Sequence, residues 1–106
     1  MEMTGTQRKY LRGLAHELRP VVQIGRPGLT EEVVNAVHDA LEEHELIKVS
    51  MRKPEDKKAT AAALAARTEA QLCGLIGHTI ILYRPHPDDP KIRLPNRPAV
   101  SSEAED

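Results

Sequence analysis

Aromatic residues are nearly absent from this chain. Its 106 residues include no Phe and no Trp, and the only two tyrosines are Tyr10 and Tyr83. The hydrophobic core must therefore be built from aliphatic side chains. The scarcity of rings also disfavours a function that needs several stacked aromatics, such as RNA binding on an aromatic sheet surface.

Cysteine and long apolar runs are equally scarce. The single cysteine, Cys73, excludes an internal disulfide, and the start Met1-Glu2-Met3-Thr4 opens neither a signal peptide nor a membrane span. These absences predict a protein of the reducing cytoplasm. The length suits one domain, which we expect at residues 1–95, followed by an acidic and disordered tail at 96–106.

The charged residues are strongly segregated, although the formal net charge is only -1. Residues 1–30 hold five Lys and Arg against two Asp and Glu, a net of +3, and residues 47–58 repeat this balance. Residues 31–46 hold six Asp and Glu and no Lys or Arg, a net of -6. The near-neutral total therefore hides distinct basic and acidic surfaces.

The first 24 residues predict a helix and a buried strand. Thr4 or Thr6 can cap a helix that runs to about Leu18, because Pro20 forces the residue before it out of helical geometry. The apolar stripe expected on this helix consists of Leu11, Leu14, Ala15 and Leu18, and the basic front consists of Arg8, Lys9, Arg12, His16 and Arg19. The apolar run at 21–24 predicts the strand.

The rest of the chain predicts two helices and three further strands. Thr30 is a good cap for a second helix at 31–44, alternation predicts a strand at 46–51, and the Ala-rich stretch predicts a third helix at 55–70. Strands at 72–76 and 79–83 flank Gly77-His78, which suits a type II′ hairpin turn. The order α-β-α-β-α-β-β predicts an α/β fold with a mixed four-stranded sheet and packed helices, with a short extended piece at 91–94.

The loop Gly25-Arg26-Pro27-Gly28 is the candidate binding site. It lies between the first strand and the second helix, where glycines let a ligand approach the backbone and unpaired N–H groups favour an anion. Taken alone, such a loop is most often an ordinary turn. The nearby cations of the first helix favour a nucleic-acid phosphate instead, while Glu31 and Glu32 should limit how far RNA extends along the second helix.

Other charged or reactive residues carry weaker signals. The second basic cluster, Arg52, Lys53, Lys57 and Lys58, could touch RNA, but we interpret it first as a solvated loop. No catalytic residue, cofactor or metal site is expected, because Cys73 falls inside a strand and the five histidines show no metal-ligand spacing. His86 with Asp88 and Asp89 could bind a metal ion, but a Pro-rich loop supplies these residue types routinely.

The chain resembles the CRM domain (chloroplast RNA splicing and ribosome maturation) of the stand-alone bacterial YhbY-like type. The matching stretches are Leu11-Arg12-Gly13-Leu14-Ala15-His16 with Pro20-Val21-Val22, Gly25-Arg26-Pro27-Gly28-Leu29-Thr30, His44-Glu45-Leu46-Ile47-Lys48-Val49, and Ile76-Gly77-His78-Thr79 leading to Leu82-Tyr83-Arg84-Pro85. Together they span about residues 4–95.

This resemblance implies a function and a set of site residues. It implies RNA binding through a GxxG loop similar to that of KH domains, association with precursors of the large ribosomal subunit, and a fold similar to the C-terminal domain of bacterial translation initiation factor 3. The RNA-binding residues would be Gly25, Arg26, Pro27 and Gly28, with Arg8, Lys9 and Arg12 as supporting cations. His78 stands where the family often has Lys, so the hairpin turn inherits no RNA contact.

The leading hypothesis is thus a non-enzymatic RNA-binding protein of ribosome assembly whose partner is ribosomal RNA. Two alternatives stay open. A sulfur-carrier-like protein would use Cys73 as an exposed thiol of low pKa. A protein–protein adaptor would use the acidic outer face of the second helix.

Overall fold

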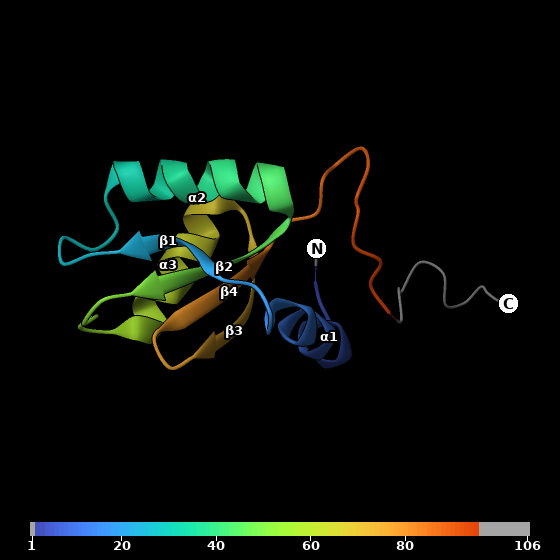
Figure 1. Cartoon of the computed structure of the whole chain (residues 1–106), viewed down its shortest axis with the longest axis horizontal. Coiled ribbons are helices and arrows are strands. Elements are labelled where there is room, and N and C mark those ends of the chain that lie inside the picture. The colour runs from blue at the N-terminus through green and yellow to red at the C-terminus, as the bar shows by residue number, and fades with distance from the viewer. Residues whose placement is uncertain (1, 96–106) are drawn as a thin grey trace, which may run out of the picture.

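The computed structural model describes residues 2–95 and is built around one four-stranded sheet (Figure 1). The strands are β1 (Pro20–Ile24), β2 (Leu46–Met51), β3 (Gln71–Ile76) and β4 (Thr79–Tyr83), and the helices are α1 (Gly5–Ala15), α2 (Glu31–His44) and α3 (Lys57–Thr68). The sheet order is β1-β2-β4-β3, with β1 parallel to β2 and β4 antiparallel to both of its neighbours. The predicted α/β fold with a mixed sheet is confirmed, while the predicted tail at 96–106 lies outside the described residues.

Helices α2 and α3 cover one face of the sheet. Alternation along β2 turns Ile47, Val49 and Met51 toward these helices, where they pack with Val37 of α2 and Leu64 of α3. The predicted Ala-rich helix contributes the small side chains of Ala61 and Ala65 to this cluster. This face holds the larger hydrophobic cluster.

Helix α1 covers the opposite face. Leu11 and Ala15 pack with Cys73, Ile81 and Tyr83, which come from β3 and β4. Ile92 and Leu94 of the C-terminal segment pack against the same cluster. The predicted extended piece at 91–94 therefore lies along the body, although it forms no strand.

The buried face of α1 differs from the predicted one. Leu11 and Ala15 of the predicted stripe are buried, but Leu14 and Leu18 are 41% and 40% exposed, and Gln7 is buried as well. Gln7 can be buried because its amide accepts a hydrogen bond from the Thr4 N–H at 3.0 Å and donates one to the Pro95 carbonyl at 3.1 Å. A satisfied glutamine thus replaces a leucine in the stripe.

The ends of the elements follow local signals. Thr4 caps α1 through a capping box with Gln7, and the helix ends at Ala15 rather than near Leu18. It ends early because the Leu18 N–H donates to the Ala15 carbonyl, three residues back, which tightens the chain into a turn. Gly77 has a φ of 59°, as the first central residue of a type II′ turn requires. None of the helices among residues 2–95 is long and apolar enough to cross a membrane.

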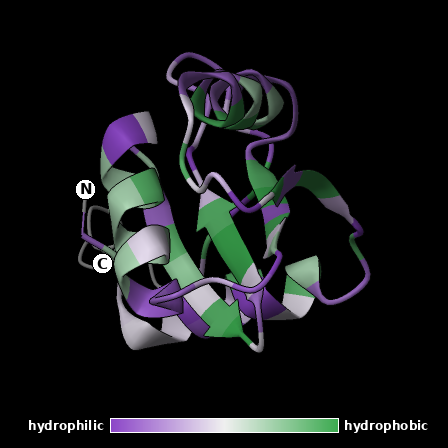
Figure 2. Cartoon of the chain, turned by 90° about the vertical axis from the view of Figure 1, so that its left-hand side faces the viewer, coloured by the Kyte–Doolittle hydropathy of each residue, from purple (hydrophilic) through white to green (hydrophobic). Residues whose placement is uncertain are grey.

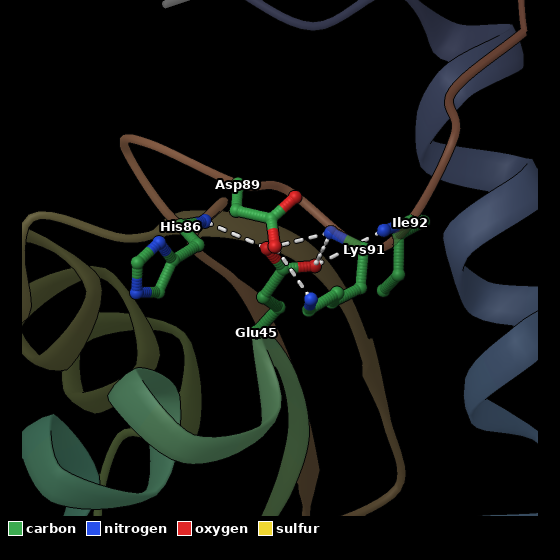
Figure 3. Close-up of polar contacts among 5 residues, drawn as sticks. All are labelled: Glu45, His86, Asp89, Lys91 and Ile92. Atoms are coloured by element: carbon green, nitrogen blue, oxygen red, sulfur yellow. Dashed lines mark hydrogen bonds and ion pairs between the residues drawn. The ribbon is translucent and has the colours of Figure 1, made fainter.

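A buried carboxylate, Glu45, fastens the C-terminal segment to the fold (Figure 3). Glu45 is only 4% exposed and lies between α2 and β2 with a φ of 65°. Its carboxylate accepts hydrogen bonds from the backbone N–H groups of His86 at 2.7 Å, Lys91 at 3.0 Å and Ile92 at 3.1 Å. Its own carbonyl accepts the N–H of Arg84 at 2.8 Å. One side chain therefore holds three points of a segment that has no regular structure of its own.

Replacing Glu45 should loosen this segment. We expect Glu45→Ala to lower the free energy of unfolding by about 2–4 kcal/mol, because three backbone N–H groups lose a charged acceptor. Glu45→Gln should lose less, since the amide oxygen can still accept hydrogen bonds. Urea denaturation measures the difference. The exposed neighbour Glu43 is the control, and an equal, small effect of Glu43→Ala and Glu45→Ala would contradict this account.

Candidate nucleic-acid interface

The loop at 25–28 is a tight connection between β1 and α2. The Gly28 N–H donates to the Gly25 carbonyl at 3.1 Å, and the Thr30 N–H donates to the Gly28 carbonyl at 3.0 Å. Gly28 has a φ of 82°, a conformation that side chains of L-residues rarely adopt, whereas a Cβ at Gly25 would meet only Pro27 Cδ at 3.7 Å. Gly28 is therefore required by the backbone, and Gly25 is not.

The start of α2 offers N–H groups beside this loop. Thr30 caps the helix by accepting the Val33 N–H at 3.2 Å, and the preceding N–H groups of Glu31 and Glu32 have no acceptor inside the helix. Glu31, which should compete with an anion here, forms an ion pair with Arg67 of α3 at 2.8 Å. Its charge is therefore partly balanced by a cation from another helix.

The connection from β2 to α3, residues 52–56, lies against the same loop. The Arg52 N–H donates to the Ile24 carbonyl at 2.9 Å, and the Met51 N–H donates to the His78 carbonyl at 2.8 Å. Because β1 and β2 are parallel neighbours, the segments that follow them leave the sheet at one edge. Open α/β sheets commonly bind ligands at such an edge, beyond the carboxyl ends of parallel strands.

An open cleft of about 610 Å³ separates these two segments. The GxxG loop lines one side with Gly25, Arg26, Pro27 and Gly28, and the β2–α3 connection lines the other with Arg52, Lys53, Pro54, Glu55 and Asp56. Figure 2, which looks onto this end of the molecule, shows mainly hydrophilic loops around the hydrophobic strands. Two members of the second basic cluster, Arg52 and Lys53, thus line a cleft, although the sequence alone favoured a solvated loop.

Four cations of these segments and of the start of α3 have side chains that are not paired with other groups of the described residues. Arg26, Arg52, Lys53 and Lys58 are exposed, and within residues 2–95 their side chains form no hydrogen bond or ion pair. The remaining lysine of the cluster, Lys57, donates to the Gly77 carbonyl at 3.1 Å. A signal for this arrangement was present in the sequence, because a strand–helix–strand unit with parallel strands brings its two following loops to one edge.

The cations of α1 lie elsewhere. Figure 1 shows the 25–28 loop beyond the left end of the sheet and α1 beside its right end, and β1 alone spans about 13 Å between them at ~3.3 Å per residue. Arg8 donates to the Met3 carbonyl at 2.8 Å, and Arg12 donates to the Cys73 carbonyl at 2.9 Å. Lys9 is exposed. The sequence argument that placed these three cations next to the loop is therefore wrong in its geometry.

Arg12 is also part of the packing. A Cβ on Gly74 would lie 2.6 Å from Arg12 Cδ, so the arginine stem occupies the space that this glycine leaves open. The register of β3 shifts between Leu72 and Gly74, which is where Cys73 and Gly74 face α1. A substitution at Arg12 would therefore disturb the contact between α1 and β3 as well as the surface charge.

Cys73 is a core residue. Its side chain is 1% exposed, and burial raises the pKa of the thiol from 9.0 to about 12, although Arg12 and Arg8 act in the opposite direction. A nucleophilic cysteine needs the reverse, an accessible thiol with a lowered pKa. The sulfur-carrier alternative therefore has no support at this residue.

The proline-rich segment after β4 holds no metal-binding cluster. Among the described residues, no group of three or more His, Cys, Asp and Glu side chains could hold a metal ion. Asp89 forms an exposed ion pair with Lys91 at 2.6 Å, and this hydrogen bond lowers the pKa of the Asp89 carboxyl. Lys91 also donates its backbone N–H to Glu45, as described above.

The burial of Cys73 leads to a direct test. At pH 8 the folded protein should react with a thiol-specific reagent at least 100-fold more slowly, on the order of the thiolate fraction lost by the raised pKa, than the urea-unfolded protein. The rate should stay low up to about pH 10, because the thiol remains protonated below its raised pKa of about 12. Rapid labelling of the native protein would restore the thiol hypothesis.

Comparisons with known proteins agree with this fold. The family model of the CRS1 / YhbY (CRM) domain matches residues 3–84. The Bacillus subtilis protein named "Probable RNA-binding protein YqeI" is 40% identical over 95 residues, which cover 88% of this chain and 99% of that protein. A Haemophilus influenzae protein named "RNA-binding protein" is 43% identical over 93 residues, covering 86% of this chain and 93% of that protein.

A solved structure has the same architecture. The solution structure of the hypothetical protein SAV1595 from Staphylococcus aureus superposes with a TM-score of 0.78 at 40% identity, covering 89% of this chain and 100% of that one. The resemblance inferred from the sequence motifs is therefore confirmed. This chain belongs to the CRS1/YhbY (CRM) domain family.

Proposed function

We propose that this protein binds RNA at the edge of the sheet where the GxxG loop lies, and that its partner is ribosomal RNA in precursors of the large subunit. The observation that carries the proposal is the cleft beside that loop, which has exposed cations without protein partners. The names of the bacterial relatives support RNA as the partner. The resemblance to the CRM family supports ribosome assembly as the process, with the cytoplasm as its place.

Binding at this edge would be mainly electrostatic. Arg26 supplies a cation, and glycine at positions 25 and 28 lets a phosphate approach the loop backbone and the N–H groups at the start of α2. Tyr83 is buried and Tyr10 belongs to α1, so neither lines this cleft for base stacking. Such a site grips the RNA backbone and reads little base sequence. No part of this activity requires a catalytic residue, which fits a non-enzymatic protein.

The exposed Lys9 of α1 remains a second candidate for RNA contact. An RNA that occupies the loop would have to extend along the molecule to reach it. Arg8 and Arg12 are weaker candidates, because both already donate hydrogen bonds to backbone carbonyls. The contribution of α1 to RNA affinity should therefore be smaller than that of the loop.

Gly25 is the best position to test the loop. Gly25→Asp should weaken binding of a short single-stranded RNA more than tenfold at about 100 mM salt, because it places a carboxylate where a phosphate is expected. The variant should still fold, since a side chain fits there, whereas a change at Gly28 would also strain the backbone. Fluorescence anisotropy measures affinity, and circular dichroism checks the fold. For the parent, log affinity should fall with log salt at a slope of roughly -2 to -4 for about three to five phosphate contacts.

Ribosome association is tested in cell extracts. The parent should co-sediment with large-subunit precursors in sucrose gradients, and Gly25→Asp with Arg26→Gln should remain at the top. A variant with Asp39→Asn, Glu42→Gln and Glu43→Gln on the exposed face of α2 is the matched comparison, and it should sediment like the parent. Loss of co-sedimentation only in this α2 variant would support the adaptor hypothesis instead.

A further inference from the structure

The β2–α3 connection has the properties of an RNA-binding wall in its own right. It lies across the cleft from the GxxG loop, and the hydrogen bond from the Arg52 N–H to the Ile24 carbonyl joins the bases of the two segments. The register of the parallel pair puts Ile24 opposite Met51, so both segments leave the sheet at the same level. Their relative position is set by the sheet rather than by flexible loops.

Some charged groups of this connection have hydrogen-bond partners within the protein, and others do not. The Asp56 carboxylate caps α3 by accepting the Ala59 N–H at 3.1 Å, so its charge is partly balanced by the helix start. Lys57 is held by the Gly77 carbonyl. Arg52 and Lys53 line the cleft with exposed side chains, and the carboxylates that line it beside them are Glu55, which is exposed, and the capping Asp56. The wall therefore presents two cations to the solvent-filled cleft.

Lys53 occupies an unusual backbone conformation. Its φ is 50°, in the left-handed region that residues other than glycine rarely adopt. The following Pro54 also disfavours right-handed helical geometry at Lys53. Neither the lysine side chain nor Pro54 favours this conformation, so the surrounding fold must hold it.

We propose that the β2–α3 connection forms the second wall of the RNA site, so that a single RNA strand lies in the cleft between Arg26 and the pair Arg52 and Lys53. This proposal rests on the function proposed above and extends it to a substrate class. The two walls continue neighbouring strands, which are only about 4.8 Å apart within the sheet. One sugar–phosphate backbone can therefore contact both walls, whereas a rigid double helix is much wider than this spacing and would rest on the rims of the cleft without entering it.

The test compares two-charge variants at opposite ends of the molecule. The probe is a ten-nucleotide oligouridylate, which is single-stranded and stacks weakly, and fluorescence anisotropy is recorded at several salt concentrations. Arg52→Gln with Lys53→Gln should lower the salt slope by about 1.4, at ~0.7 for each lost phosphate contact. Between about 50 and 200 mM salt, the parent should therefore lose about sevenfold more affinity than this variant.

Control variants separate the effect of removing cations from the cleft from the effect of changing the net charge of the protein. Lys91→Gln with Arg93→Gln removes the same charge at the far end of the molecule and should leave affinity within about twofold of the parent (Figure 1). Glu55→Gln should bind as tightly as the parent or more tightly, because it removes a like charge from the cleft. Thermal melts verify that each variant folds.

The outcomes distinguish this inference from the function on which it rests. If Arg26→Gln weakens binding and the Arg52 and Lys53 variant binds like the far-end control, the second wall is refuted and the loop site stands. If the parent does not bind RNA, or Arg26→Gln has no effect, the proposed loop function itself fails. A ten-base-pair RNA duplex should compete with the oligouridylate at least tenfold more weakly than unlabelled oligouridylate, and equal competition would refute the single-strand assignment.

Discussion

The parallel pairing of β1 with β2 is the constraint on which the candidate site depends. Two segments separated by more than 20 residues in the sequence meet because α2 returns the chain so that both strands run in the same direction. The Arg52 N–H to Ile24 carbonyl hydrogen bond extends this pairing to the point where both strands end. An antiparallel pairing would have sent the β2–α3 connection to the other edge of the sheet, and the GxxG loop would have had no cationic wall opposite it.

The same constraint separates α1 from the loop. Helix α1 precedes β1, so the chain must cross the length of that strand before it reaches Gly25. The helix is instead committed to the opposite sheet face, where Leu11 and Ala15 enter the second hydrophobic cluster and Arg12 packs over Gly74. Part of the basic character of α1 therefore has a structural use, and the cations closest to the loop come from later in the sequence.

Local signals in the sequence were enough to predict most of the elements. The limits of α2, β2 and β4 were predicted as found, because Thr30 is a strong cap, β2 alternates between its two faces, and Gly77-His78 marks the turn before β4. The burial of Gln7 on α1 was not predictable in this way. Its amide donates a hydrogen bond to the carbonyl of Pro95, which is 88 residues away in the sequence.

Glu45 and the second basic cluster show the same limit more clearly. In the sequence Glu45 is one of six carboxylates in an acidic segment, yet its environment is set by backbone N–H groups at 86, 91 and 92. From the sequence alone, Arg52 and Lys53 were interpreted as part of a solvated loop. The pairing of β1 with β2 places them in the same cleft as Gly25. Sequence patterns identify which residues could serve at a site, but contacts between distant segments decide which of them meet. The RNA-binding roles of Arg52 and Lys53 stay predictions.

The sign of the electrostatic potential at the cleft depends on which charged side chains are already paired with other groups of the protein. A formal net charge of -1 would suggest no attraction for RNA, and carboxylates do surround the start of α2. Glu31 is paired with Arg67 and Asp56 caps α3, so two of the carboxylates near the cleft are partly balanced by groups of the protein itself, whereas Glu55 stays exposed. The cations Arg26, Arg52 and Lys53 have no such partner among the described residues. The exposed carboxylates of α2 at Asp39, Glu42 and Glu43 then repel a polyanion from the outer face of that helix, which favours its approach from the cleft. A chain with almost no net charge can in this way attract RNA to one edge and exclude it from another.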